Sequence, residues 1–158
     1  MSDKVPMTKE GHYKMTEELQ RLKTKDRHAV VKEIEIARAH GDLSENAEYH
    51  AAKEKQSFIE GRIQMIEDKL ARAEVIDVSK VPRNRVVFGV TVVLEDEETY
   101  EKVKYQIVGE DEADVENGKI SVTSPIARAL IGKEPDDTAV AVTPGGKREF
   151  TILEIIRK

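Results

Sequence analysis

A long stretch without proline constrains the fold of this chain more than any other feature. Between residues 8 and 74 of the 158-residue sequence there is no proline, and residues with high helix propensity dominate. Apolar residues recur there at alternating spacings of four and three, which is the pattern of a coiled-coil seam. In the second part of the stretch these residues are Ile59, Ile63, Ile66, Leu70 and Ala73. The stretch therefore predicts long amphipathic helices that pack against each other.

The first part of the stretch has the same spacing in two separate sets. The sets are Met15, Leu19 and Leu22, followed by Val30, Ile34 and Ala37. Eight residues separate Leu22 from Val30, and this spacing does not fit a heptad repeat. The sequence therefore predicts a stutter or a local bend between these two residues.

A short break near residues 40–44 divides the helical stretch into two arms of about 30 residues, each roughly 45 Å long as a helix. Gly41 can adopt the left-handed conformation that ends a helix. Two amphipathic helices joined by a short loop are expected to fold back as an antiparallel pair. The apolar residues near the break are small, which predicts a slender tip: Ala37, Ala39, Ala47, Ala51 and Ala52.

The second half of the chain predicts a sheet. β-branched residues cluster over 86–94, 103–109 and 120–124, and two further strand patterns, 138–143 and 148–156, flank a Pro-Gly-Gly turn. Ser124 is placed to cap a short helix that begins at Pro125 and ends at Gly132. The acidic segment 109–118 predicts an exposed loop.

The predicted fold class is therefore two-domain, α + (α+β). We expect an antiparallel coiled-coil hairpin over residues 1–75, with its acidic tip near 41–46. A linker over 76–85 and an α+β domain over 86–158 follow.

Composition narrows the classes of function. The chain has no cysteine, which excludes thiol chemistry and thiolate metal sites. Its net charge of −5 argues against a protein that binds duplex nucleic acid over its whole surface. The N-terminus does not resemble a signal peptide, and no apolar run approaches the roughly 18 residues of a membrane span. We expect a cytoplasmic protein with no membrane partner and no small-molecule substrate, and the sequence has no Gly-rich phosphate loop.

Two acids in the break, Asp42 and Glu45, have two interpretations. An Asp-x-x-Glu sequence before a helix is close to a capping box, in which Asp42 accepts the Glu45 backbone N–H. Alternatively, the carboxylates are metal ligands, since Mg²⁺ is often held by one or two carboxylates together with water and phosphate oxygens. Two exposed carboxylates leave most of the Mg²⁺ coordination shell unfilled. In the second interpretation the pair therefore completes a metal site that a partner begins.

Three segments carry a family resemblance. They are HGDLSENAEYHAAKE at the break, and DEADVENGKISVTSPIARALIGK and AVTPGGKREFTI in the second half. Together they closely resemble the bacterial Gre family of transcript cleavage factors, and they are nearer to its A-type members. The likeness covers nearly the whole chain and is weakest over residues 95–105.

The resemblance implies an N-terminal coiled-coil hairpin and a C-terminal domain of FKBP-like fold. It further implies that the C-terminal domain docks on RNA polymerase while the hairpin enters the secondary channel of the polymerase. Asp42 and Glu45 match the tip acids that help to hold a Mg²⁺ ion shared with the polymerase. The polymerase's own site then cleaves the 3′ end of backtracked RNA. On this expectation the chain is not itself an enzyme.

Other positions of the tip motif also match the family. Arg38 and Lys53 lie on opposite arms near the break, where they can face each other or a phosphate. The resemblance implies that they contact the extruded RNA. Asn46 and Tyr49 belong to the same motif, and the resemblance implies that they shape the tip.

Three alternatives stay open. A channel-binding regulator that does not promote cleavage has the same architecture, but the intact Asp-x-x-Glu-Asn sequence disfavours it. A prolyl isomerase needs an aromatic-lined site, whereas residues 76–158 have no tryptophan and only four other aromatic residues. A coiled-coil adaptor without chemistry is the third alternative, and mutation of Asp42 separates it from the leading interpretation.

Overall fold

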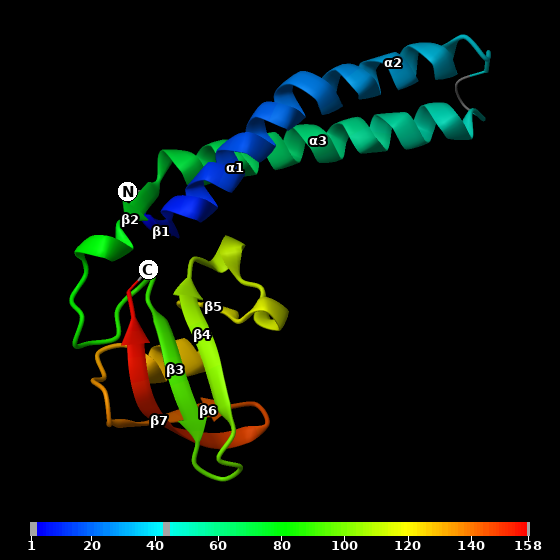
Figure 1. Cartoon of the computed structure of the whole chain (residues 1–158). Helices are drawn as coiled ribbons and strands as arrows, with labels where there is room; N and C mark the ends of the chain where they lie inside the picture. The colour runs from blue at the N-terminus through cyan, green and yellow to red at the C-terminus, as the bar shows by residue number, and fades with distance from the viewer. Residues whose placement is uncertain (1–2, 43–44, 158) are drawn as a thin grey trace. The chain divides into compact units, whose positions relative to one another are not determined.

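The computed structural model describes residues 3–42 and 45–157 (Figure 1). The chain forms two compact units. One unit is His12–Arg72, and the other combines Asp3–Gly11 with the chain from Ala73 onward. In the part of the chain that the structure describes, no helix is long and apolar enough to cross a membrane.

The first unit is a helical hairpin. Its first arm consists of α1 (Lys9–Arg21, of which the first three residues belong to the other unit), the π-helix η1 (Leu22–Asp26) and α2 (Arg27–Arg38). The second arm is α3 (Ala47–Ala71), and α2 and α3 lie side by side (Figure 1). The buried apolar residues are Met15, Leu22, Val30 and Ala37 of the first arm and Ala52, Ile59, Ile63 and Ile66 of the second. The heptad pattern therefore predicted the hairpin correctly.

The predicted stutter is the π-helix. The backbone N–H of Arg27 donates to the carbonyl of Leu22, five residues back, instead of four as in an α-helix. The wider turn takes up one extra residue, so the seven-residue spacing of a heptad becomes the eight residues between Leu22 and Val30. Both residues consequently point into the same buried seam.

Ion pairs join the two arms of the hairpin on both sides of the seam. The guanidinium of Arg62 donates two hydrogen bonds to Glu18, of 2.7 and 2.8 Å. Arg27 and Glu60 make an equivalent pair, with distances of 2.9 and 2.8 Å. These hydrogen bonds lower the pKa of the Glu18 and Glu60 carboxyls, because each guanidinium stabilises the ionised form. Lys23–Glu67 and Lys55–Glu33 add single contacts of 2.9 and 3.1 Å.

We expect the hairpin to lose thermal stability on acidification. A carboxyl whose pKa is lower in the folded state than in the unfolded state stabilises the fold. This contribution is fully present above the ordinary glutamate pKa of about 4.3. That contribution is lost as the pH falls through the folded value. Helical circular dichroism during melting, at about pH 6 and at about pH 3, measures the loss. The double variant Glu18→Gln/Glu60→Gln should show a smaller fall than the parent, and an equal fall in the two proteins would contradict the assignment.

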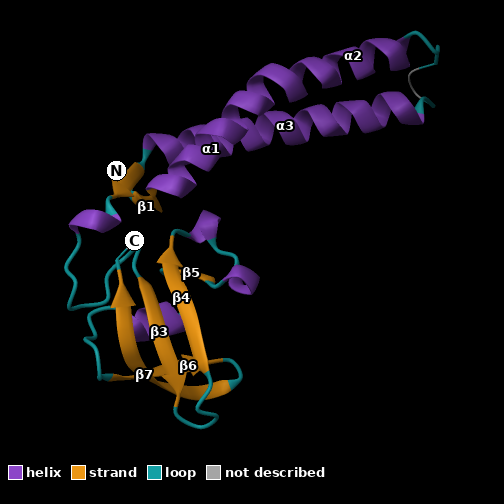
Figure 2. Ribbon diagram, in the orientation of Figure 1, coloured by secondary structure: helices purple, strands orange, loops and turns teal. Residues whose placement is uncertain are grey.

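The second unit contains a five-stranded sheet with the order β5-β4-β3-β7-β6 (Figure 2). The strands are β3 (Thr91–Asp96), β4 (Lys102–Val108), β5 (Lys119–Ser121), β6 (Thr138–Thr143) and β7 (Gly146–Ile156). Only the β4–β5 pair of this sheet is parallel. A short helix, α4 (Pro125–Leu130), contributes Ala127 and Leu130 to the core, beside Phe150 and Ile152 of β7. The two-domain α + (α+β) prediction is thereby confirmed.

Two predicted strands are shorter than expected. The run from residue 86 becomes a strand only at Thr91, because Gly89 has a φ of +93° and turns the chain. The run 120–124 pairs only as far as Ser121. Ser124 instead caps α4, as predicted, by accepting the backbone N–H of Ala127 at 3.2 Å.

A pairing that no local pattern predicted joins the two ends of the helical stretch. The segment β1 (Val5–Thr8) pairs in parallel with β2 (Ala73–Ile76). Ala73, expected in the coiled-coil seam, therefore lies in a strand, and η2 (Val78–Lys80) occupies part of the expected 76–85 linker. This pairing is why the division of the structure differs from the expected ranges 1–75, 76–85 and 86–158.

The acidic segment 109–118 is largely exposed, as predicted, and it contains the short turns η3 (Glu110–Glu112) and η4 (Val115–Asn117). One of its side chains, however, makes contacts outside the segment. The Glu112 carboxylate accepts the backbone N–H of Thr8 at 3.1 Å, the Thr8 hydroxyl, and the N–H of Gly109 at 3.1 Å. The Thr8 oxygen in turn accepts the N–H of Gly11 at 3.0 Å. A carboxylate thus lies at the N-terminus of α1, where the helix dipole favours negative charge.

Candidate functional site

The candidate site is the tip of the hairpin, between the end of α2 at Arg38 and the start of α3 at Ala47. Gly41 turns the chain with a φ of +108°, and its N–H donates to the carbonyl of Arg38 at 3.3 Å. Glycine adopts this conformation without a steric penalty. Residues 43 and 44 of the predicted tip lie outside the described residues.

Asn46 ties the two arms together at the tip. Its Oδ1 accepts the backbone N–H of Tyr49 at 3.0 Å, which makes it the N-cap of α3. Its Nδ2 donates to the carbonyl of Ala37, in the last turn of α2, at 2.6 Å. One side chain therefore satisfies a backbone group at the start of one helix and another at the end of its neighbour.

This geometry excludes the capping interpretation of the two acids. The helix begins at Ala47 and takes Asn46 as its cap, so Asp42 lies too far upstream to cap it. Glu45 precedes the helix and does not occupy the third helical position that a capping box requires. The start of α3 is therefore fixed without either carboxylate.

Asp42 and Glu45 are both exposed, and they line one shallow hollow of about 380 Å³. Among the residues that the structure describes, the lining is His40, Asp42, Glu45, Asn46, Ala47 and Glu48. His40 Nδ1 lies 3.3 Å from Glu48 Oε2, so this pair spans the hollow from one arm to the other. Sequence reasoning missed the pair, because two residues eight apart come together only once the arms fold back.

The hollow offers oxygen ligands but not a complete metal site. Within residues 3–42 and 45–157, no group of three or more His, Cys, Asp or Glu side chains is arranged to hold a metal ion. Two exposed carboxylates fit a hard cation such as Mg²⁺, which also accepts water and phosphate oxygens as ligands. Chemically, the tip can supply part of a coordination shell.

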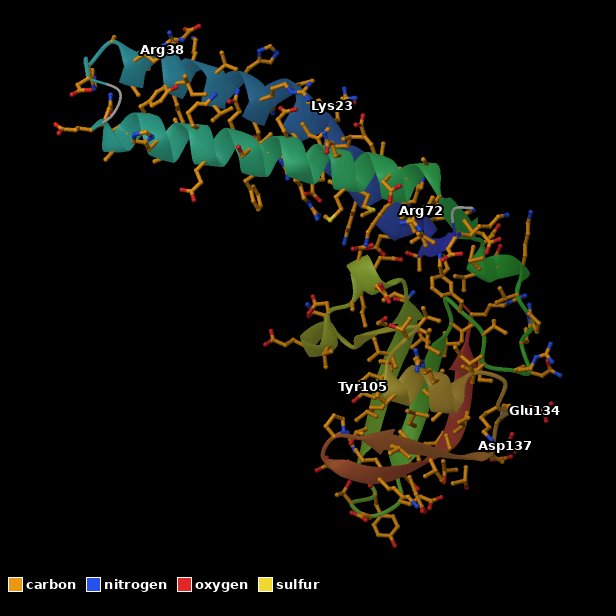
Figure 3. All side chains as sticks on the ribbon, turned by 180° about the vertical axis from the view of Figure 1, so that it is seen from behind. Lys23, Arg38, Arg72, Tyr105, Glu134 and Asp137 are labelled. Carbon is orange, nitrogen blue, oxygen red and sulfur yellow. The ribbon has the colours of Figure 1, made fainter. Side chains whose placement is uncertain are left out.

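The two predicted basic positions flank the tip. Arg38 is the last residue of α2 and lies at the far end of the hairpin (Figure 3). Its side chain is exposed and makes no hydrogen bond or ion pair with any described residue. Lys53 is exposed on α3, and its ammonium donates to Gln56 at 3.2 Å. Both side chains are exposed near the tip, and neither lines the hollow.

Tyr49 lies in the first turn of α3 and is half-buried. Its ring packs edge-on against the ring of His50, with 5.6 Å between centroids. Its backbone N–H donates the capping bond to Asn46, so Tyr49 takes part in fixing the start of α3.

Two family models identify the class of protein to which the helical hairpin and the sheet unit belong. A family model described as "Transcription elongation factor, N-terminal" matches residues 5–75. A second, "Transcription elongation factor, GreA/GreB, C-term", matches residues 81–157. The chain belongs to the GreA/GreB family of transcription elongation factors.

Similar proteins agree with this family over their full length. The transcription elongation factor GreA of Phenylobacterium zucineum is 61% identical over 153 residues, covering 97% of this chain and 98% of the relative. GreA of Anaeromyxobacter sp. is 62% identical over 152 residues, covering 96% of this chain and 92% of the relative. Among solved structures, GreA factor homolog 1 (Gfh1) of Thermus thermophilus is 31% identical. The match covers 96% of this chain and 98% of that one, with a TM-score of 0.44.

Proposed function

We propose that this chain binds RNA polymerase, inserts its hairpin into the secondary channel and stimulates the polymerase's own cleavage of backtracked RNA 3′ ends. The observation that carries the proposal is the pairing of Asp42 and Glu45 around one exposed hollow at the end of the hairpin. Membership of an elongation factor family supplies the polymerase as partner. The small seam residues Ala37 and Ala52 allow close approach of the two arms near the tip, as a narrow channel requires.

In this proposal Asp42 and Glu45 hold a Mg²⁺ ion jointly with the polymerase. Such an ion, when bound beside a first one, stabilises the attacking and leaving oxygens of an in-line displacement at phosphorus. The two carboxylates supply hard oxygen ligands and leave the rest of the shell to polymerase groups, water and RNA phosphate. The chain is then a donor of ligands, and the catalytic centre is that of the polymerase.

A fixed tip is part of the proposal. Asn46 holds the end of α2 and the start of α3 in one arrangement. The His40–Glu48 pair bridges the same two arms across the hollow. The two carboxylates lie on a short connection and need these contacts to stay in position. A displacement of about 1 Å in a catalytic group can lower the reaction rate strongly.

The test is a stalled polymerase complex that carries 3′-extruded, end-labelled RNA and Mg²⁺. Addition of the chain should shorten the RNA and restore elongation, and the chain without polymerase should leave the same RNA intact. Inhibition of elongation with no shortening would instead identify a channel-binding regulator that does not promote cleavage.

Arg38 and Lys53 are proposed to contact the phosphates of the extruded RNA. The double variant Arg38→Ala/Lys53→Ala should lower the cleavage rate by about tenfold at low salt, and the difference from the parent should narrow as salt rises. The difference narrows because each lost phosphate contact makes the dependence of binding on salt weaker. For single-stranded nucleic acid, the slope of log affinity against log salt concentration falls by about 0.7 per contact. Lys32→Ala, which removes another exposed cation of α2, is the matched control. Equal cleavage rates for the double variant and the parent at every salt concentration would contradict the proposed contact with RNA.

A further inference from the structure

One Asn-Gly sequence, Asn117–Gly118, lies at the end of η4. In such a sequence the backbone nitrogen of the glycine can attack the side-chain carbonyl carbon of the asparagine, because glycine has no side chain that obstructs the approach. The other two asparagines, Asn46 and Asn84, precede alanine and arginine, which obstruct the same attack. Asn117 is also exposed, so water reaches its side chain. The chain therefore has one position at which deamidation, the loss of ammonia from the side-chain amide, is favoured chemically.

The fold requires the glycine that makes this position reactive. Gly118 ends η4 with a φ of +75°, in the left-handed range that favours glycine. A Cβ added at Gly118 would lie 2.9 Å from the carbonyl oxygen of Lys104 in β4, closer than real Cβ atoms come to other atoms. The carbonyl of Gly118 also accepts the backbone N–H of Gln106 at 2.7 Å. A bulkier residue at this position, which would slow deamidation, is therefore incompatible with the turn.

Hydrogen bonds instead engage both reacting groups. The backbone N–H of Gly118, whose nitrogen is the nucleophile, donates to the carbonyl of Val115 at 3.0 Å. The Nδ2 of Asn117, which is the leaving group, donates to Asp114 Oδ2 at 2.6 Å. Two backbone hydrogen bonds between Asp114 and Lys119, of 2.8 and 3.0 Å, close the segment at its base. We call residues 114–119 the Asn117 turn. Attack requires the Gly118 nitrogen to lose its proton, and therefore to break its bond to Val115.

We propose that Asn117 is a deamidation site that the folded Asn117 turn protects and that reacts when this turn opens. The deprotonated nitrogen of Gly118 forms a bond to Cγ of Asn117, the Cγ–Nδ2 bond breaks, and the departing nitrogen takes up a proton from solvent and leaves as ammonia. Water then hydrolyses the resulting cyclic imide to aspartate or isoaspartate. One water is consumed and one ammonia is released, with no oxidation or reduction. The inference is independent of the proposed function, because it concerns the second unit and not the hairpin tip.

Both products disturb the Asn117 turn. Aspartate at this position places a carboxylate beside Asp114 and removes the donor of their hydrogen bond. Isoaspartate adds a methylene to the backbone directly before Gly118, where the pairing of β5 with β4 begins. Asparagine is not regenerated, so each reacted molecule records an earlier opening of the turn and opens more easily afterwards.

Peptide mapping of the full chain by mass spectrometry, after incubation at mildly alkaline pH for increasing times, tests the proposal. The peptide that contains Asn117 should deamidate at least about tenfold faster in denaturant than in the folded chain, because reaction of the folded chain depends on local opening. The peptides that contain Asn46 and Asn84 are internal controls and should change little in either condition. Equal rates for Asn117 in the two conditions, or no reaction of Asn117 in denaturant, would overturn the proposal.

Asp114→Ala tests the protecting contact. It removes the acceptor of the Asn117 amide, so deamidation of the folded chain should become at least about threefold faster, as expected for the loss of one hydrogen bond. The rate in denaturant should stay that of the parent. Glu116→Ala, which removes another exposed acid of the same turn, is the matched control and should react like the parent in both conditions.

Melting curves show whether each variant is folded during the incubation. A folded Asp114→Ala protein that deamidates at the parent rate would overturn the protecting role of this contact. The comparison of the parent with and without denaturant does not depend on either variant, so the deamidation site is tested even if Asp114→Ala does not fold.

Discussion

Asp42→Asn and Asp42→Ala should both lose the stimulation of RNA cleavage, by at least about tenfold, the loss that a misplaced metal ligand already causes. The N-cap of α3 should persist in both variants, because Asn46, and not Asp42, caps this helix. Both should also compete with the parent for polymerase. The readouts are shortening of labelled RNA in stalled complexes, thermal melting, and competition binding.

The matched control for Asp42→Asn is Glu54→Gln. It removes one negative charge by a nearly isosteric change from an exposed carboxylate of α3 that does not line the hollow. We expect Glu54→Gln to keep most of the cleavage stimulation. Recovery of Asp42→Asn activity in Mn²⁺ would support a role in metal binding. Full activity of Asp42→Asn at low Mg²⁺ concentration would rule out Asp42 as a metal ligand.

Asn46→Ala should disable the tip in a different way, through its structure. It removes the N-cap of α3, at a cost of about 1 kcal/mol, and leaves the Ala37 carbonyl without its side-chain donor. The thermal midpoint of the hairpin should fall by several degrees, about 4 °C for each kcal/mol. Cleavage stimulation should fall as well, because the two acids are no longer held at a fixed separation.

Asn46→Asp separates the two bonds that Asn46 makes. Aspartate is as good an N-cap as asparagine, so the start of α3 should persist. It has no donor for Ala37, however, and places a carboxylate against a carbonyl oxygen. We therefore expect a smaller loss of stability than in Asn46→Ala but a clear loss of cleavage. Asn84→Ala serves as the control for asparagine removal at an exposed position. Parent-like melting and cleavage by Asn46→Ala would show that the tip does not need this bond.

The hairpin was predictable from the sequence because its determinants are local and periodic. The four-three spacing gave the seam, and the eight residues from Leu22 to Val30 gave the position of the π-helix. The same reasoning found Asp42 and Glu45, because two acids in a break between helices are visible in the sequence alone. The capping alternative, with Asp42 as the cap, placed the start of the second helix wrongly. The sequence could not decide between the two, since Asp-x-x-Glu and a single Asn are both acceptable caps. Only the three-dimensional position of Ala37 selects Asn46.

Contacts between distant segments were not predictable from local patterns. The pairing of Val5–Thr8 with Ala73–Ile76 involves two segments of four residues, too short for a strand period to be recognised. The bond between Glu112 and Thr8 spans 104 residues, so no local pattern in the acidic segment indicated it. Gly89 delays the start of β3 to Thr91, and a glycine inside a β-branched run was the sequence sign of that turn.

The parallel pairing of β1 with β2 makes the hairpin, in topological terms, an insertion into the C-terminal unit. Residues on both sides of His12–Arg72 belong to one compact body. Closing a flexible loop of this length would cost about 4 kcal/mol of chain entropy. An antiparallel hairpin removes most of that cost, because once folded it already brings its two ends together. Local helical contacts also form faster than pairings between distant segments. The hairpin should therefore fold first and bring β1 within reach of β2. The C-terminal unit then assembles only after the hairpin inserted in it has folded.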